Sequence, residues 1–227
     1  MSHLIVFDID GTLIHSHPRE VDCFLQALTE VTGISQITKD LCQYEHITET
    51  GIINQCMMTA LQRLPTSQEL NAIEKTFLSL FSTLLLKEPT LPIKGVENIL
   101  PVIAQQSNIS LAIATGSYGR SAFLKLHHAN LPLTELPLGS CDDSHDRVEI
   151  MKAALTRALI HYQIPSFKKV TYVGDGPWDI KAARDLNWDL IAVASNYTPA
   201  QLQAWGATKV IEHYLNEKMF LDLLFSD

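Results

Sequence analysis

Short, continuously apolar segments alternate along this chain with longer segments of helical spacing. Residues 4–7 form the first apolar run, and a strand buried on both faces of a parallel sheet has this uninterrupted pattern. Three later segments share it, and two weaker candidates accompany them. These are residues 109–114, 170–173 and 190–194, with 136–138 and 209–211 as the weaker pair.

Helical periodicity fills the gaps between these predicted strands. Between Val148 and Tyr162 the apolar residues fall on one face of a helix, and Thr198 followed by Pro199 is a typical helix start. Strand and helix in alternation imply right-handed crossovers. The sequence therefore predicts an α/β fold with a doubly wound, Rossmann-like parallel sheet.

One long segment interrupts the alternation. Residues 16–92 contain no predicted strand, only helical periodicity with turns near Gly33, Pro65 and Pro89. We interpret this segment as an all-helical second domain inserted directly after the first strand. Residues 1–15 and 93–227 then form the α/β core domain.

Composition and net charge indicate which kinds of binding partner the chain is not expected to have. The chain has 227 residues, with 25 acidic and 17 basic side chains, a net charge of −8 and 46% hydrophobic residues, enough for a sizeable core. An acidic chain without a Lys/Arg cluster is not expected to bind nucleic acid or an anionic membrane.

Compartment and topology are also predicted from composition. The longest apolar stretch, residues 77–86, is too short to span a bilayer, and no signal peptide is visible at the N-terminus. The four cysteines show no CxxC spacing, so we expect free thiols and a cytoplasmic protein.

Acidic residues follow two of the predicted strands. Asp8 and Asp10 end the first strand and point to the same side, and Asp175 ends a later strand with Asp179 one turn beyond it. Strand-end turns commonly contain Asp, so each pair alone could be structural. Because ligands bind beyond the carboxyl ends of strands in open α/β sheets, we expect the four carboxylates to converge. Oxygen ligands of this kind favour Mg²⁺.

A third strand ends in Thr115 and Gly116, ahead of a helix. A hydroxyl, free backbone N–H groups and a helix N-terminus together suit a phosphate group. Thr at a helix start is more often only a cap, and the motif alone is therefore weak evidence for phosphate binding. Its position in the same layer as Asp8 and Asp175 supports that interpretation.

Taken together, these motifs resemble the haloacid dehalogenase superfamily, in its phosphatase branch. Residues 8–13 (DIDGTL) look like the first family motif, Thr115 like the second, a basic residue near position 147 like the third and residues 174–179 (GDGPWD) like the fourth. The helical segment falls where the phosphoglycolate phosphatase-like subfamily carries its cap.

The resemblance implies a mechanism. Asp8 is then the nucleophile that forms an aspartyl-phosphate, and Asp10 is the general acid and base. Mg²⁺ would be bound by the Asp8 carboxylate, the Asp10 backbone carbonyl and Asp175, with Asp179 in support. Thr115, Gly116 and a cation would hold the phosphoryl oxygens.

Two residues could supply that cation. Arg147 lies at the start of the helix that runs to Tyr162, and Lys152 is about 7.5 Å further along it and roughly 140° around it. Helix N-termini in this architecture point toward the site, so we predict Arg147 as the phosphate ligand. The alternative is a surface arginine paired with a nearby Asp.

Two comparisons with the family pattern bear on the type of reaction. Dehalogenases of the superfamily lack an Asp at the position of Asp10, so Asp10 favours phosphoryl transfer. Mutases carry a basic pair after the second motif and in the cap, whereas here only Arg120 is basic after Thr115, which disfavours a mutase. We expect a Mg²⁺-dependent phosphatase for a small organic phosphate ester. The alternatives are a phosphomutase or a non-hydrolytic phosphate-binding or regulatory protein. The physiological ester and the oligomeric state stay open.

Several polar residues have no predicted catalytic role. His15 replaces the family's usual Asp, and it and His17 are expected to be solvated rather than metal ligands with His127 and His128. Asp146 is expected to cap the following helix. Residues 44–51 (YEHITETG) either face the substrate or form an ordinary turn between helices.

Overall fold

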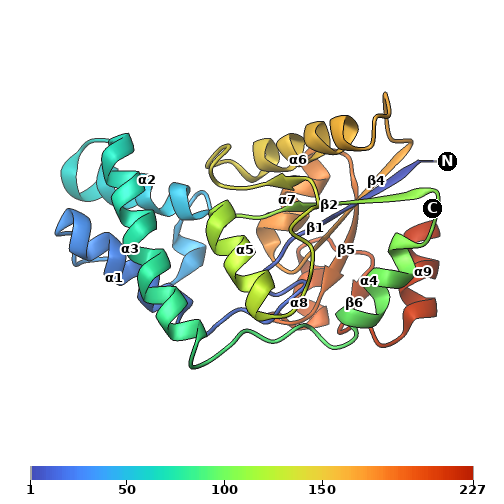
Figure 1. Ribbon diagram of the computed structural model, residues 1–227. Coiled ribbons are helices and arrows are strands. Elements are labelled where there is room, and N and C mark those ends of the chain that lie inside the picture. The colour runs from blue at the N-terminus through green and yellow to red at the C-terminus, as the bar shows by residue number, and fades with distance from the viewer. Residues whose placement is uncertain (1, 227) are drawn as a thin grey trace.

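The protein folds around a six-stranded, all-parallel sheet with the strand order β3-β2-β1-β4-β5-β6 (Figure 1). The computed structural model describes residues 2–226, without the side chain of Cys42. β1 lies at the centre of the sheet, between β2 and β4. The strands are β1 (His3–Phe7), β2 (Ile109–Ala114), β3 (Leu138–Gly139), β4 (Lys169–Gly174), β5 (Asp189–Val193) and β6 (Val210–Ile211).

The doubly wound α/β fold predicted from the sequence is confirmed. All four continuous apolar runs form strands, and both weaker candidates form two-residue edge strands, β3 and β6. β3 begins at Leu138, where the prediction ended, because Pro137 has no N–H to donate to a neighbouring strand.

Helices cover both faces of the sheet, as the uninterrupted apolar strands require. One face carries α6 and α7, and the other carries α4, α5 and α9, with α8 near β6 (Figure 1). These helices are α4 (Val96–Ala104), α5 (Gly119–His128), α6 (Arg147–His161), α7 (Pro177–Asp185), α8 (Pro199–Ala204) and α9 (Glu217–Phe225).

Alternate residues of β1 supply the two cores. Leu4 and Val6 belong to the core beneath α6 and α7, while Ile5 and Phe7 belong to the core on the opposite face. All four side chains are buried, so substituting any one of them would leave a cavity in a core. Packing on both faces therefore fixes the position of β1, the central strand, which leads into the predicted site.

Residues 16–92 form helices and no strand, as predicted. In Figure 1 the three α-helices lie together to one side of the sheet. Their own apolar interior includes Phe77, which packs edge-on against Phe24 and stacks on Phe81. The elements are α1 (Glu20–Thr32), η1 (Leu41–Gln43), α2 (Glu49–Leu61) and α3 (Ser67–Leu85).

The two chain segments that connect this helical block to the sheet run side by side. The His15 N–H donates to the Leu91 carbonyl at 2.9 Å, and the Ile93 N–H donates to the Leu13 carbonyl at 2.9 Å. Ile14 and Pro92 form an antiparallel bridge between them. The helical block thus leaves and rejoins the sheet at one place.

The cysteines whose side chains the structure describes are unpaired. Cys23, Cys56 and Cys141 are free thiols, and the side chain of Cys42 lies outside the described residues. In residues 2–226, no helix combines the length and apolar character needed to cross a membrane.

Candidate active site

The ends of three neighbouring strands meet at the carboxyl edge of the sheet. β1 leads to Asp8 and Asp10, β2 to Thr115, and β4 to Asp175. All four residues line a cavity of about 560 Å³ that the helical block closes from the other side. Parallel strands bring their carboxyl ends to one edge, so residues far apart in sequence share this cavity.

Three carboxylates form a buried acidic cluster. Oxygens of Asp8, Asp175 and Asp179 all lie within 4.8 Å of one another. Burial raises the pKa of Asp8 to about 8, opposed by Arg147 and reinforced by Asp179 and Asp10. Burial and neighbouring carboxylates likewise raise the pKa of Asp175. The three carboxylates of the cluster have only Arg147 as a cationic partner among the described residues, so negative charge is in excess.

Local hydrogen bonds hold the two carboxylates of the fourth motif in place. Asp179 Oδ2 accepts from the N–H groups of Asp175 and Gly176, each at 3.1 Å, at the start of α7. Asp175 Oδ2 accepts from Asn196 Nδ2 at 2.8 Å. Pro177 at the first helical position and this capping arrangement explain why the helix starts here.

A tight turn brings the first motif to the cluster. Gly11 has φ +75°, and its N–H donates to the Ile14 carbonyl at 2.7 Å. A Cβ atom at Gly11 would overlap the Asp175 carboxylate. Only glycine therefore allows this backbone to approach Asp175 so closely.

Arg147 is the cation nearest to Asp8. One guanidinium nitrogen lies 3.2 Å from Asp8 Oδ1 and 3.4 Å from Asp179 Oδ1. Burial acts to lower the pKa of Arg147, but Asp179, Tyr172 and Asp8 outweigh it, so the pKa lies above its ordinary value. Its Nε lies buried without a partner, as a donor that faces no protein acceptor.

The first residue of α6 is thus directed into the cavity. Asp146 caps the helix, as expected, because its carboxylate accepts from the Val148 N–H at 2.7 Å. Lys152 instead lies on the outside of α6, where it pairs with Glu149. The structure brings Arg147 to the site and leaves Lys152 in solvent.

Thr115 and Gly116 form the loop opposite Arg147. The Thr115 hydroxyl accepts from the Ser117 N–H at 3.2 Å, and both Thr115 and Gly116 line the cavity. A Cβ at Gly116 would come within 3.0 Å of the Arg147 guanidinium. Glycine thus leaves space between this loop and the arginine.

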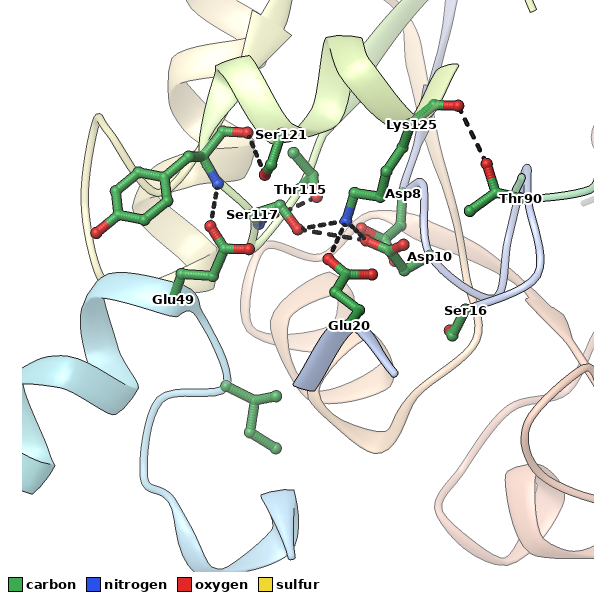
Figure 2. Close-up of polar contacts among 12 residues, drawn as sticks. Asp8, Asp10, Ser16, Glu20, Glu49, Thr90, Thr115, Ser117, Ser121 and Lys125 are labelled. Atoms are coloured by element: carbon green, nitrogen blue, oxygen red, sulfur yellow. Dashed lines mark hydrogen bonds and ion pairs between the residues drawn. The ribbon is translucent and has the colours of Figure 1, made fainter. Parts of the chain in front are cut away.

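A buried lysine that the sequence interpretation missed contacts Asp10. Lys125, on α5, donates to Asp10 Oδ2 at 2.5 Å, to Glu20 Oε1 at 2.8 Å and to the Ser117 hydroxyl at 2.9 Å (Figure 2). All three ammonium donors are therefore used. Burial acts to lower the pKa of Lys125, but Asp10, Glu20 and Glu49 outweigh it and raise that pKa above its ordinary value.

The sequence did contain a signal for Lys125. It lies on the buried face of α5 together with Ala122 and Leu126, where an unpaired lysine would be costly. A lysine on an apolar helix face predicts a buried carboxylate partner. It does not indicate which carboxylate, and Glu20 comes from the helical block.

The N-terminus of α2 contacts the loops around the cavity. The Glu49 N–H donates to the Gly116 carbonyl at 2.9 Å, and the Glu49 carboxylate accepts from the Tyr118 N–H at 2.6 Å. Thr48 donates to the His145 carbonyl at 2.9 Å. Residues 44–51, for which the sequence left two interpretations, therefore line the cavity in part and also hold the helical block against the sheet.

The histidines do not gather into a metal site within the described residues. His17 is buried, its Nε2 donates to the Glu88 carbonyl, and its Nδ1 accepts from the Arg19 N–H. It is therefore not solvated, contrary to expectation, whereas His15 is exposed. His127 contacts His128 edge to face.

The acidic cluster is suited to a divalent cation. Asp8, Asp175 and Asp179 offer oxygen atoms only, and Arg147 is the one cation that pairs with them among the described residues. Oxygen donors with excess negative charge are the ligand set for Mg²⁺. The Asp10 side chain is not part of this cluster, because it is held by Lys125.

The fold and this arrangement of strand-end residues define a doubly wound α/β domain with an acidic site at the carboxyl edge of its sheet. The sequence matches the haloacid dehalogenase-like hydrolase family over residues 3–187, and the chain belongs to this family. The comparison with curated proteins found no match.

Solved structures share the fold. A hydrolase from Pseudomonas syringae is 20% identical with a TM-score of 0.72, over 96% of this chain and 97% of the other. A protein from Bacteroides vulgatus, provisionally described as a β-phosphoglucomutase, is 16% identical with a TM-score of 0.68, over 99% and 91%. A predicted phosphoglycolate phosphatase from Haemophilus somnus 129pt is 16% identical with a TM-score of 0.62, over 96% and 97%.

Proposed function

We propose that the protein is a Mg²⁺-dependent phosphatase that hydrolyses a small organic phosphate monoester through an aspartyl-phosphate on Asp8. The observation that carries this proposal is the position of Asp8. Its carboxylate is buried at the cavity wall, between Arg147 and the carboxylates of Asp175 and Asp179. A carboxylate nucleophile needs nearby positive charge before it can approach an anionic phosphoryl group.

Arg147 and Thr115 are suited to hold the phosphoryl oxygens. The unpartnered Nε of Arg147 and the planar shape of the guanidinium match phosphate geometry. Thr115 lies across the cavity, and the N–H groups that follow it precede α5. These donors would stabilise the charge that builds on the phosphoryl group during transfer.

Asp10 is suited to the general acid and base role. Its Oδ2 is bound by Lys125, while Oδ1 is buried without a partner in a residue that lines the cavity. One oxygen is thus positioned and the other is available for a proton. In the proposed reaction Asp10 protonates the leaving oxygen and later deprotonates the attacking water.

Mg²⁺ would be held by Asp8, Asp175 and Asp179, together with the backbone carbonyl of Asp10. When bound, it would neutralise the excess negative charge of the cluster and orient the phosphoryl group. Burial raises the pKa values of Asp8 and Asp175, and neighbouring carboxylates reinforce the shift, so a bound cation would favour their ionised forms.

We further propose that residues 16–92 act as the cap of a catalytic domain formed by residues 1–15 and 93–227. Two observations support it. The helical block joins the sheet at one paired connection, and the Thr48–Glu49 segment closes the cavity by hydrogen bonds to Gly116 and His145. A closed cap would exclude water and large substrates.

A phosphomutase is the second function left open by the sequence, and the cavity argues against it. Mutases must bind a second phosphate group. Among the described residues that line the cavity, Arg147 is the only Lys or Arg. Arg120, the one basic residue that follows Thr115 closely, is 77% exposed and lies near Glu74 instead.

The free thiols of Cys23, Cys56 and Cys141 are typical of a reducing compartment, and we propose a cytoplasmic location.

The test is phosphate release from a panel of monoesters with Mg²⁺, comparing the wild type with Asp8→Asn and Asp10→Asn. The change at Asp8 is nearly isosteric, so turnover should be abolished with the fold intact. Acid-quenched wild type should carry one phosphoryl group, which Asp8→Asn lacks. Turnover by folded Asp8→Asn at the wild-type rate would exclude the covalent route.

A further inference from the structure

We propose that the substrate is a phosphate monoester whose leaving group is uncharged and apolar, such as a short alkyl or aryl alcohol. This inference rests on the proposed phosphatase function and adds a substrate class to it. It follows from the chemistry of the cavity wall that the helical block supplies.

The cavity has a polar floor and an apolar roof. The floor consists of the strand-end residues that surround Asp8. The roof comes from the helical block, mainly from α1, the segment around η1 and the start of α2, and half of the side chains that it contributes to the cavity are hydrocarbon. Its apolar members are Pro18, Val21, Phe24, Leu25, Leu41, Ile47 and Ile52. With the phosphoryl group on the floor, the leaving group must extend toward this roof.

The charges of the roof exclude an anionic leaving group. Its acidic residues are Glu20 and Glu49, and among the described residues it contributes no Lys or Arg to the cavity. Arg147 lies on the floor and is already paired with Asp8 and Asp179. A leaving group with a carboxylate or a second phosphate would be buried without a cation, which strongly disfavours its binding.

A cationic leaving group also lacks a partner. Glu20 is paired with Lys125 at 2.8 Å. Glu49 accepts from the Tyr118 N–H, and burial raises its pKa to about 8, so it is largely protonated near neutral pH. Neither carboxylate offers a free negative charge to the cavity.

Five polar side chains of the roof already form hydrogen bonds within the protein, including Thr38, which accepts from the Asp40 N–H, and Ser16, which accepts from Asn196 Nδ2, each at 3.1 Å. The Tyr44 hydroxyl donates to the Thr38 carbonyl at 2.9 Å, and Thr48 donates to the His145 carbonyl. Both ring nitrogens of His17 are used as well. Sugar hydroxyl groups placed here would lose their hydrogen bonds to water without equivalent replacements. An apolar leaving group has no hydrogen bonds to water that it could lose on entering the cavity.

Alkyl phosphates of increasing length test the proposal directly. Each methylene that enters the roof should raise kcat/KM by up to about fourfold, until the cavity is filled. Hexyl phosphate should therefore exceed methyl phosphate by orders of magnitude, and phosphoglycolate and glucose 6-phosphate should be poor substrates. Equal or better turnover of phosphoglycolate would overturn the proposal and leave the phosphatase function standing.

A matched pair separates shape from charge. Neohexyl phosphate and phosphocholine have nearly the same shape, but only phosphocholine carries a positive charge on its leaving group. We expect neohexyl phosphate to be the better substrate. A preference for phosphocholine would mean that the carboxylates of the roof recognise a cation, and the proposal would be wrong.

Variants locate the effect in the roof. Leu41→Lys introduces a cation there and should reverse the preference, lowering kcat/KM for hexyl phosphate and raising it for phosphoglycolate. Leu86→Lys is the matched control, because Leu86 is 78% exposed and does not line the cavity. Val21→Lys makes the same test from α1 should Leu41→Lys fail to fold. An unchanged preference in a folded roof variant would contradict the proposal.

Binding measurements keep the two proposals distinguishable. Alkylphosphonates are not hydrolysed, so their affinity for folded Asp8→Asn can be measured by calorimetry whether or not any ester is turned over. If no ester is hydrolysed, the phosphatase function fails, but affinity that rises with chain length still supports an apolar site. Affinity independent of chain length overturns the substrate class.

Discussion

Replacing Lys125 with Met tests whether this lysine stabilises the carboxylates around the cavity. The two side chains are similar in length and apolar volume, so the change mainly removes the charge. Lys125 is completely buried, and it binds Asp10 and Glu20 at the same time (Figure 2). Without it, two carboxylates face each other in a closed space, with Glu49 nearby.

Breaking a buried ion pair by removing one partner costs about 3–5 kcal/mol. For a protein of this size, each kcal/mol lowers Tm by roughly 2–4 °C, so we expect a decrease of about 6–20 °C. Burial already raises the pKa of Glu20 to about 7 in the presence of Lys125, and its loss would raise that pKa further.

The pH dependence follows from the direction of this shift. A carboxyl group whose pKa is raised by folding contributes stability below its unfolded pKa, and that stability is lost as the pH rises through the folded pKa. The destabilisation by Lys125→Met should therefore be larger at about pH 8 than at about pH 5.5, where Glu20 can take up a proton.

The assay is urea unfolding at both pH values, with Lys152→Met as the control. Lys152 forms an exposed pair with Glu149, which is worth at most about 1 kcal/mol. The double variant with Glu20→Gln should recover part of the loss, because one of the two carboxylates is removed. Equal, small effects of Lys125→Met and Lys152→Met, or an effect independent of pH, would refute the reasoning.

Three other predictions concern the site. Arg147→Ala should lower kcat/KM by about 10²–10³-fold, whereas Lys152→Ala should leave it unchanged; reversed effects in steady-state kinetics would mean that Arg147 does not hold the phosphoryl group. Turnover should stop in excess chelator and return with Mg²⁺ but poorly with Ca²⁺, whose looser coordination misplaces the nucleophile; full activity in chelator would contradict a metal requirement. Burial raises the pKa of Glu49 from its ordinary 4.5 to about 8, so its ionisation destabilises the fold as the pH rises between those values. Glu49→Gln keeps an acceptor for the Tyr118 N–H, so its Tm should exceed that of the wild type at high pH and converge with it near the unfolded pKa; a Tm difference independent of pH would count against this assignment.

Local sequence patterns were sufficient for the sheet and for much of the candidate site. A strand buried on both faces must be apolar throughout, so β1 and β4 are recognisable without any partner. The acidic residues that follow them, Asp8 and Asp175, meet because parallel strands end at one edge. Arg147 could be placed because helix geometry fixes which residue of α6 faces that edge.

Contacts between distant segments could not be predicted in the same way. Lys125 and Glu20 are separated by 105 positions and belong to different helices. The sequence around either residue does not indicate that the other is its partner. The burial of His17 has the same origin, because its acceptor, Glu88, lies at the opposite end of the helical block. Such pairs depend on how the block folds back on the sheet, which periodicity does not describe.

The paired connection at Ile14 and Pro92 has a consequence for how this architecture can vary. Hydrogen bonds join the two ends of the helical block where it meets the sheet. For the sheet, the block is therefore equivalent to a loop whose two ends are held together. The entropy of closing a loop grows only slowly with its length, by about 0.6 kcal/mol for each doubling. A longer, shorter or differently built block can therefore be attached at this junction with little penalty to the sheet. Substrate preference can then change over evolutionary time while the strand-end residues keep their positions.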